Sequence, residues 1–113
     1  MESRDVFLLE EIIDYCDRIA STIARHDGDF SAFESDLDFQ EVCAFRAIQI
    51  GELVNKLSDV VKNANPDIPW HLAVGLRNIL THDYGSIDNK RMWNTLLEDY
   101  PRFKDSCAKI ISV

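Results

Sequence analysis

Four side chains that suit acid–base or anion chemistry lie within eight residues of one another: Arg77, Asn78, His82 and Tyr84. Histidine is the side chain that exchanges protons near neutral pH. The guanidinium of arginine presents a planar fork of N–H donors that matches the oxygens of a phosphate or a carboxylate. These residue types are therefore typical of a site for an anionic ligand.

The directions of these side chains are set by a short helix that the sequence predicts from Pro69 to about His82. His82 comes five positions after Arg77, so its side chain points about 140° around the helix from that of Arg77. Arg77 and Tyr84 are seven residues apart and share a face if the helical geometry continues. Arg77 and His82 thus converge only on a ligand that lies across the helix end, or together with residues from a second subunit.

Each residue also has an ordinary structural interpretation when it is taken alone. Arg77 is a typical partner in a surface ion pair, and Tyr84 is a typical aromatic at the rim of a fold. His82 is favourable at a helix end simply because its charge opposes the helix dipole. A functional interpretation therefore depends on the whole group.

The charge of the chain is unevenly distributed. Its 113 residues include 20 acidic and 12 basic ones, for a formal net charge of −8. This balance argues against a protein that coats nucleic acid without specificity, because Lys and Arg drive binding to phosphates. Residues 1–52 hold 13 acidic and 4 basic residues, whereas residues 53–113 hold 7 and 8. We therefore expect an anionic ligand only in the second half.

Apolar residues recur at three- and four-residue spacing, and Gly and Pro are scarce, which predicts an all-α fold. We expect one domain over residues 1–113, a compact helical bundle with two long helices and two or three shorter ones. The expected helices cover about 4–26, a short turn around 33, 38–63, 69–82, 88–97, and a last helix after a break at Tyr100-Pro101.

Several positions predict how these helices end and pack. Ser31, Asp38 and Asp88 are the expected N-caps, and Gly28 is the expected left-handed residue after the first helix. Gly51 lies inside the second long helix, where it costs about 1 kcal/mol relative to Ala. We expect it to permit the close approach of another helix.

In the helix that carries the four side chains, the apolar residues follow helical periodicity. We therefore expect Leu72, Leu76, Ile79 and Leu80 to point toward the core. Trp70, at the start of this helix, is an expected core or interface anchor.

The remaining features exclude several other classes of protein. Cys16, Cys43 and Cys107 form no CxxC pair, so we expect reduced, buried thiols. No pattern of residues predicts a metal site or a cofactor site. The longest stretch without a charged residue has nine residues, whereas a membrane span needs about twenty apolar ones. Because no secretory signal is recognisable at the N-terminus, we expect a cytoplasmic protein.

The group Arg77-Asn78-x-x-x-His82-x-Tyr84 resembles the Arg-x4-His-x-Tyr motif of the HepT-like toxins, a branch of the HEPN superfamily. The resemblance covers nearly the whole chain. Further matching segments are Arg4-Asp5, Ile50-Gly51-Glu52, Pro66-x-Ile68-Pro69-Trp70, Asp88 ahead of Met92-Trp93, and Tyr100-Pro101. Gly85 departs from the pattern, since relatives often carry a bulky residue there, and this concerns the shape of the loop more than the chemistry.

The resemblance implies an α-helical bundle that forms a homodimer and acts as a metal-independent endoribonuclease on RNA. It implies catalytic roles for Arg77 and His82 and a supporting role for Asn78. The usual partner in this family is a small nucleotidyltransferase antitoxin of the MntA type. That partner is understood to transfer AMP to the motif tyrosine, here Tyr84, and thereby to silence the toxin.

The residue types suit this chemistry. RNA cleavage without a metal uses the 2′-hydroxyl as an internal nucleophile and needs a base, an acid for the leaving oxygen and a cation for the charge on phosphorus. One histidine cannot be the base and the acid in the same step. Two copies of His82 across a twofold axis would supply both, so we expect a homodimer with the motif at its interface.

Two other hypotheses stay open. A non-catalytic helical binding module would dock a nucleotidyltransferase or hold a nucleotide without cleaving RNA, and the net charge of −8 favours it. A purely structural dimerisation bundle would use Arg77 and His82 only to bridge subunits. If the site is a nuclease, the charge suits a small Arg-lined cleft for short single-stranded RNA rather than a surface for long duplexes.

Overall fold

The computed structural model describes residues 1–112, so Val113, the last residue of the predicted domain, lies outside the described residues. Within residues 1–112 the secondary structure is entirely helical, without a strand, as predicted. None of the helices in this part of the chain combines the length and apolar character that a membrane span needs. The elements are α1 (Ser3–Arg25), α2 (Phe30–Ser35), α3 (Leu37–Lys56), α4 (Asp59–Ala64), α5 (Trp70–His82), the 3₁₀ turn η1 (Tyr84–Ser86), α6 (Asn89–Asn94), the π-helical turn η2 (Thr95–Asp99) and α7 (Tyr100–Ser112).

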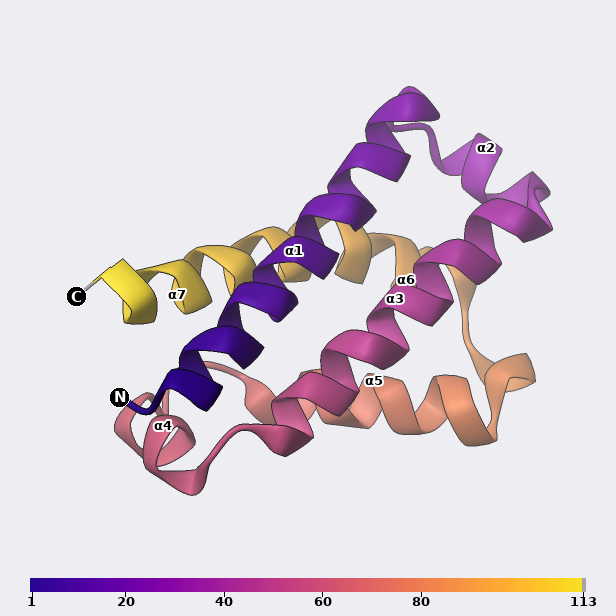
Figure 1. The fold of residues 1–113 in the computed structure, drawn as a ribbon. Helices are drawn as coiled ribbons and strands as arrows, with labels where there is room; N and C mark the ends of the chain where they lie inside the picture. The colour runs from indigo at the N-terminus through magenta and orange to yellow at the C-terminus, as the bar shows by residue number, and fades with distance from the viewer. Residues whose placement is uncertain (113) are drawn as a thin grey trace.

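The central element is α3, which packs against both α1 and α5. Figure 1 shows α1 and α3 side by side and running in opposite directions, with α5 and α7 crossing behind them. α7 also packs against α1. The prediction of two long helices with shorter ones around them is confirmed, since α1 and α3 have 23 and 20 residues.

A cluster of aromatic rings joins α6 to the N-terminal half of the bundle. The ring of Trp93 lies 5.1 Å from that of Phe33 and 6.1 Å from that of Phe39, measured between centroids. Phe33 and Phe39 meet edge to face at 5.2 Å, a favourable geometry for aromatic pairs. All three side chains are buried, so this cluster fixes the C-terminal part of α6 against α2 and α3.

Two of the predicted helix ends are confirmed. Gly28 follows α1 with a φ of +63°, in the left-handed region that glycine adopts without a steric penalty. Asp88 caps α6, because its side chain accepts a hydrogen bond of 3.0 Å from the backbone N–H of Lys90.

The caps of α2 and α3 lie two residues before the predicted ones. Asp29 accepts a hydrogen bond from the backbone N–H of Ser31 (3.0 Å), and Asp36 accepts one from that of Phe39 (3.2 Å). Asp29 and Asp36 have the extended backbone that an N-cap requires. Ser31 and Asp38, the predicted caps, are therefore already inside their helices.

The prediction of one helix over residues 38–63 is wrong, because α3 ends at Lys56. Leu57 is extended, with ψ at 144°, and Ser58 then caps the separate helix α4. Asp5 of α1 accepts hydrogen bonds from the backbone N–H of Ser58 (3.0 Å) and from its hydroxyl (2.7 Å). This contact between residues 53 positions apart holds the backbone in the extended form that interrupts the helix.

The predicted break at Tyr100-Pro101 is also wrong. The chain runs from α6 through η2 into α7 without leaving helical geometry. In η2 the backbone N–H of Tyr100 bonds to the carbonyl of Thr95, five residues earlier. This wide turn accommodates Pro101, whose ring and missing N–H would disrupt a regular α-helix at that point.

The apolar face of α5 points only partly to the core. Leu80 is buried and Leu76 is half-buried, but the side chains of Leu72 and Ile79 are 57% and 44% exposed. The prediction that all four point to the core is therefore wrong for Leu72 and Ile79. The physical reason is that α6 and α7 leave an open groove along this side of α5.

We expect Asp5→Asn to lower the free energy of unfolding by about 1–3 kcal/mol at pH 7, because an amide cannot accept both hydrogen bonds from Ser58. The backbone N–H of Ser58 lowers the pKa of Asp5 from its usual value, and the Ser58 hydroxyl and Arg4 lower it further against the opposing effect of burial. This stabilisation is present above the pKa of an unfolded aspartate, about 3.9, and is lost as the pH falls through the lower pKa of the folded state.

Urea unfolding of both proteins at pH 7 and pH 3 measures the effect. The difference between wild type and Asp5→Asn should shrink at pH 3. Asp14→Asn is the control, since Asp14 forms an exposed ion pair with Arg18 and such pairs contribute at most about 1 kcal/mol. An equal difference at both pH values would contradict the assigned role of Asp5.

Candidate functional site

Gly51 sets the distance between α3 and α5. A Cβ atom at this position would lie 2.3 Å from Cβ of Arg77 and 2.8 Å from the carbonyl oxygen of Ala73. Non-bonded atoms do not approach so closely, so only glycine permits this crossing. The predicted close approach of a helix at Gly51 is confirmed, and the residue that it meets is Arg77.

Arg77 binds Glu52 of α3 directly beside this crossing. Its Nε donates a hydrogen bond of 2.5 Å to Oε1 of Glu52, and its Nη2 forms an ion pair with the same oxygen. Its Nη1 donates to the side-chain oxygen of Asn78 at 2.8 Å. Because a guanidinium has five N–H donors, two of them remain for a ligand.

The ion pair also sets the electrostatics of the site. The side chains of Arg77 and Glu52 are 24% and 35% exposed, so water reaches both. Glu52 offsets the positive charge of Arg77 and fixes the plane of its guanidinium. An incoming phosphate would bind the two unused donors while Arg77 keeps its hydrogen bonds to Glu52 and Asn78.

His82 and Tyr84 lie at the opposite end of α5 from Trp70. His82 is the last residue of the helix and is exposed, and its imidazole forms no ion pair within residues 1–112. Asp83 ends the helix, so Tyr84 belongs to η1. Its side chain is 41% exposed.

Two residues of α3 influence the hydroxyl of Tyr84. Partial burial raises the pKa of its hydroxyl, and the nearby Glu41 and Cys43 raise it further. The phenol therefore keeps its proton at neutral pH. Glu41 precedes Glu52, the partner of Arg77, by three turns on α3.

The structure thus brings only part of the predicted group together within one protomer. Arg77 and Asn78 are in contact, and Arg77 points to α3. His82 projects from the helix end about 140° away around α5, and Tyr84 lies beside α3. One protomer alone does not form a closed pocket around these four side chains.

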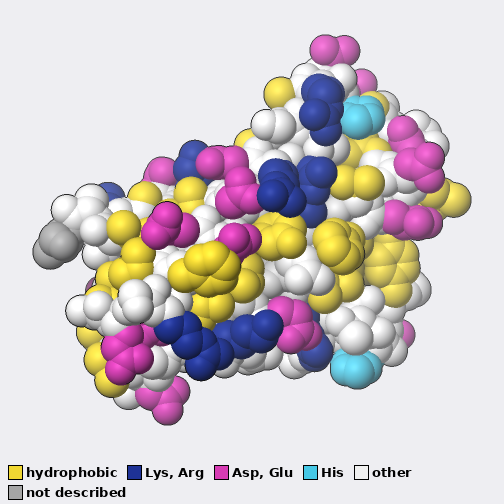
Figure 2. Space-filling model, viewed as in Figure 1, with side chains coloured by type: hydrophobic (Ala, Val, Ile, Leu, Met, Phe, Trp, Pro, Cys, Tyr) yellow, Lys and Arg dark blue, Asp and Glu magenta, His cyan; other side chains and the backbone are white. Residues whose placement is uncertain are grey.

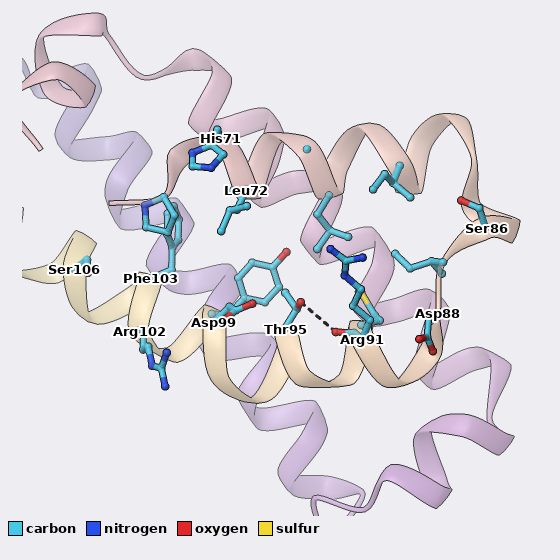
Figure 3. Close-up of a pocket in the computed structure, with 18 residues that line it drawn as sticks. His71, Leu72, Ser86, Asp88, Arg91, Thr95, Asp99, Arg102, Phe103 and Ser106 are labelled. Carbon is cyan, nitrogen blue, oxygen red and sulfur yellow. Dashed lines mark hydrogen bonds between the residues drawn. The ribbon is translucent and has the colours of Figure 1, made fainter. Parts of the chain in front are cut away.

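A groove with a volume of about 740 Å³ lies on the other side of α5, between it and the segment from α6 to α7. Figure 3 shows this groove, with Leu72 on α5 facing Thr95 and Phe103, while Arg91 reaches up from α6 toward α5 and Arg102 points away. The lining is largely apolar and includes Ile79.

The hydroxyl of Tyr100 is buried beside this groove and has no hydrogen-bond partner within residues 1–112. A buried hydroxyl without a partner is unfavourable by about 1–3 kcal/mol. The groove itself leaves the apolar side chains of Leu72 and Ile79 exposed.

The three cysteines are buried and unpaired, as predicted. Burial raises the pKa of Cys16 and Cys107 to about 12 and that of Cys43 to about 11. These thiols are therefore poor nucleophiles. Residues 1–112 hold no group of three or more His, Cys, Asp or Glu side chains arranged to bind a metal ion.

The partner of Arg77 is the part of the site that sequence reasoning did not identify. Glu52 belongs to the matching segment Ile50-Gly51-Glu52, but its contact with Arg77 joins residues 25 positions apart. The neighbouring Gly51 could have indicated that Glu52 contacts another helix, because a residue next to a close helix crossing lies beside the other helix.

We expect Gly51→Ala to destabilise the fold by about 1–3 kcal/mol, as overpacking in a tight contact does. The added methyl group collides with the Cα–Cβ region of Arg77 and with the backbone of Ala73, so the helices must separate and the contact between Arg77 and Glu52 must lengthen. Urea unfolding measures the loss. Gly85→Ala is the control, because a Cβ at Gly85 meets nothing within 4 Å, and equal stability of the two variants would contradict the tight crossing.

Comparison with known proteins agrees with the resemblance seen in the sequence. A family model described as ribonuclease HepT-like matches residues 10–110. Two proteins of Methanocaldococcus jannaschii whose names describe them as candidate RNases are similar to the chain. MJ1380 is 34% identical over 73% of this chain and 84% of its own length, and MJ0125 is 29% identical over 98% of this chain and 95% of its own.

A protein of Thermococcus cleftensis named as a probable ribonuclease HepT is 31% identical over 62% of this chain and 64% of its own length. No solved structure matches the chain. The family model covers most of the sequence, including the crossing at Gly51 and the whole segment from Arg77 to Tyr84. The chain therefore belongs to the HepT-like ribonuclease family.

Proposed function

We propose that this protein is the toxin of a toxin–antitoxin pair and acts as a metal-independent endoribonuclease in the cytoplasm. Arg77 and His82 are the catalytic residues, Asn78 supports Arg77, and Tyr84 accepts AMP from a nucleotidyltransferase antitoxin. The observation that carries the proposal is the anchored guanidinium of Arg77, which keeps two free N–H donors on the helix that ends in an exposed His82.

In the proposed reaction the 2′-oxygen of a ribose attacks the adjacent phosphorus while the bond from phosphorus to the 5′-oxygen breaks. One histidine takes the proton of the 2′-hydroxyl, and a second gives a proton to the leaving 5′-oxygen. Arg77 holds the phosphate oxygens and stabilises the charge that develops on them. The products are a 2′,3′-cyclic phosphate and a free 5′-hydroxyl.

We propose that a homodimer supplies the second histidine. The exposed Leu72 and Ile79 and the apolar groove beside them support an interface on this side of α5. Gly75, also on α5, supports it as well, because a Cβ there meets nothing within the protomer. A glycine inside a helix costs about 1 kcal/mol, and close contact with a second copy would offset that cost. His82 lies at the C-terminal end of this face, whereas Arg77 lies on the α3 side of the helix, so a bound RNA strand would cross the helix end to meet both.

Tyr84 is accessible enough to act as the AMP acceptor. In the transfer, its oxygen bonds to the α-phosphorus of ATP, the bond from that phosphorus to the bridging oxygen breaks, and pyrophosphate leaves. Because burial and Glu41 raise the pKa of Tyr84, the transferring enzyme must supply the base that takes the phenolic proton. The bound AMP would then place a negative charge and a bulky group two residues from His82.

The second candidate function is a non-catalytic module that docks a nucleotidyltransferase or a nucleotide. The pairing of Arg77 with Glu52 favours it, as does the net charge of −8, since both weaken the attraction for RNA. This alternative predicts a complex with the partner but no cleavage.

We expect His82→Ala to lower the rate of RNA cleavage by about 10²–10⁴-fold, the usual contribution of a general acid or base. The assay uses unmodified protein, a single-stranded RNA and a chelator of divalent metals. Thr81→Ala, an exposed neighbour on the same turn of α5, is the control. Cleavage at an unchanged rate by His82→Ala would remove His82 from the mechanism, and no cleavage by the wild type would favour the binding module.

The same assay tests the dimer through Ile79→Glu. A charge on this exposed position leaves the core intact but opposes burial against a second copy, so the variant should be monomeric in analytical ultracentrifugation and should lose cleavage. Leu37→Glu, on a side chain that is 69% exposed at the start of α3, should remain dimeric and active. A monomeric Ile79→Glu protein that cleaves RNA at the wild-type rate would overturn the shared active site.

We expect Tyr84→Phe to abolish modification by the partner, because the oxygen that bonds to phosphorus is gone. Intact mass spectrometry after incubation with a cognate nucleotidyltransferase and ATP should show added AMP units on the wild type and none on the variant. Tyr15→Phe, on a half-buried tyrosine of α1, is the control. Equal modification of Tyr84→Phe and wild type would place the acceptor elsewhere.

A further inference from the structure

Phe45 of α3 is an aromatic side chain that the fold leaves in water. It is 55% exposed, and Phe7 of α1 is 59% exposed, although Phe33, Phe39 and Phe103 are buried. Figure 2 shows an apolar patch in the middle of the face that α1 and α3 present. What distinguishes Phe45 is its place on α3, because an exposed ring there is available to a ligand of the proposed site.

Phe45 lies between the two parts of the proposed site. It follows Glu41 by one helical turn and precedes Glu52 by two turns, so the three side chains share one stripe of α3. Glu41 is near Tyr84, and Glu52 binds Arg77. With a rise of 1.5 Å per residue, Phe45 lies about 6 Å along the helix from Glu41 and about 10 Å from Glu52.

Two cations lie beyond Glu52 at this end of the stripe. Lys56 follows Glu52 by one turn of α3, and Arg4 precedes Asp5, which binds Ser58 two residues after Lys56. Both are exposed, and neither forms an ion pair within the described residues 1–112. Figure 2 shows Lys and Arg side chains along the lower edge of this face, next to the apolar patch.

We infer that Phe45 is a stacking platform for a base of single-stranded RNA, with Lys56 and Arg4 holding the phosphates of the same strand. The inference rests on the proposed ribonuclease function and names the form of RNA that the site takes. A ring in this place lets one nucleotide stack while a neighbouring phosphate reaches the free donors of Arg77.

The charge of the protein favours stacking as the source of affinity. With 12 basic residues against 20 acidic ones, phosphate contacts supply little binding, whereas stacking on an aromatic ring does not depend on charge. Stacking requires an exposed base face, which a duplex hides between neighbouring pairs. The platform therefore selects single strands and tolerates different bases, because every base has a π-face.

A basic partner protein is the competing occupant of this face, since an exposed Phe45 between Glu41 and Glu52 also suits an apolar contact ringed by positive charge. The free cations at Lys56 and Arg4 argue against it, because they would repel such a partner at the adjoining end of the patch. They attract the phosphates of RNA.

The test measures binding of a single-stranded oligoribonucleotide that contains 2-aminopurine, whose fluorescence falls when the base stacks. All binding measurements use protein that also carries His82→Ala, so that the RNA stays intact. Phe45→Ala should weaken binding about tenfold and abolish the quenching, and Phe45→Trp should restore both. Leu37→Ala, which removes a more exposed apolar side chain at the start of α3, should change neither the affinity nor the quenching.

Salt dependence tests the cations separately. Lys56→Ala should lower the slope of log affinity against log salt by about 0.7, the value for one phosphate contact on a single strand, and should leave the quenching intact. Circular dichroism of each variant confirms that the helices are preserved, so that a loss of binding reports on the contact.

The outcomes separate this inference from the proposed function. If Phe45→Ala binds the oligonucleotide as tightly as Leu37→Ala does, or if only its complex with a partner protein weakens, the platform is overturned even when wild-type protein cleaves RNA. If the wild type does not cleave but binding and quenching depend on Phe45, the platform stands and the nuclease proposal fails.

Discussion

The crossing of α3 and α5 at Gly51 is the constraint on which the site depends. With no Cβ at Gly51, the backbone of α5 reaches a distance at which Arg77 and Ala73 touch α3. The next residue of α3, Glu52, then lies within reach of the guanidinium. The direction of Arg77 and the donors that it keeps for a ligand follow from how closely these two helices pack. The glycine weakens the helix locally, and the contact that it permits compensates for that loss.

The sequence predicts the local part of this arrangement and not the contacts between distant residues. Gly51 is recognisable because glycine is unfavourable inside a helix, which indicates a close neighbour. That the neighbour is Arg77, and that Glu52 binds it, depends on a tertiary contact that no spacing along the chain encodes. The same limit explains the two wrong helix boundaries. Asp5 breaks the predicted second helix at Ser58 from 53 positions away, and the π-helical turn η2 carries Pro101 through a place where local rules predict a break.

The exposed face of α5 shows a second limit of prediction from the sequence. Periodicity identifies an apolar stripe, and Leu72, Ile79 and Leu80 all belong to it. Only Leu80 is buried within the protomer. An apolar stripe that packs inside one subunit and one that packs against a second subunit have the same sequence pattern, because both exclude water from the same kind of side chain. What the structure adds is the groove beside Leu72 and Ile79, which exists only once α6 and α7 have been placed.

The charge of the protein and the pairing of Arg77 with Glu52 both favour single-stranded over duplex nucleic acid at the proposed site. A free arginine on a surface attracts any polyanion, including duplex nucleic acid, and the attraction grows with each added cation. Here Glu52 offsets the charge of Arg77, and 13 of the 20 acidic residues lie in the first 52 positions. In the proposed site, an RNA strand therefore gains little from charge alone and would have to match the guanidinium, the exposed ring and the histidine at the helix end together. A flexible single strand can adopt that shape, whereas a rigid duplex cannot turn its bases outward to do so.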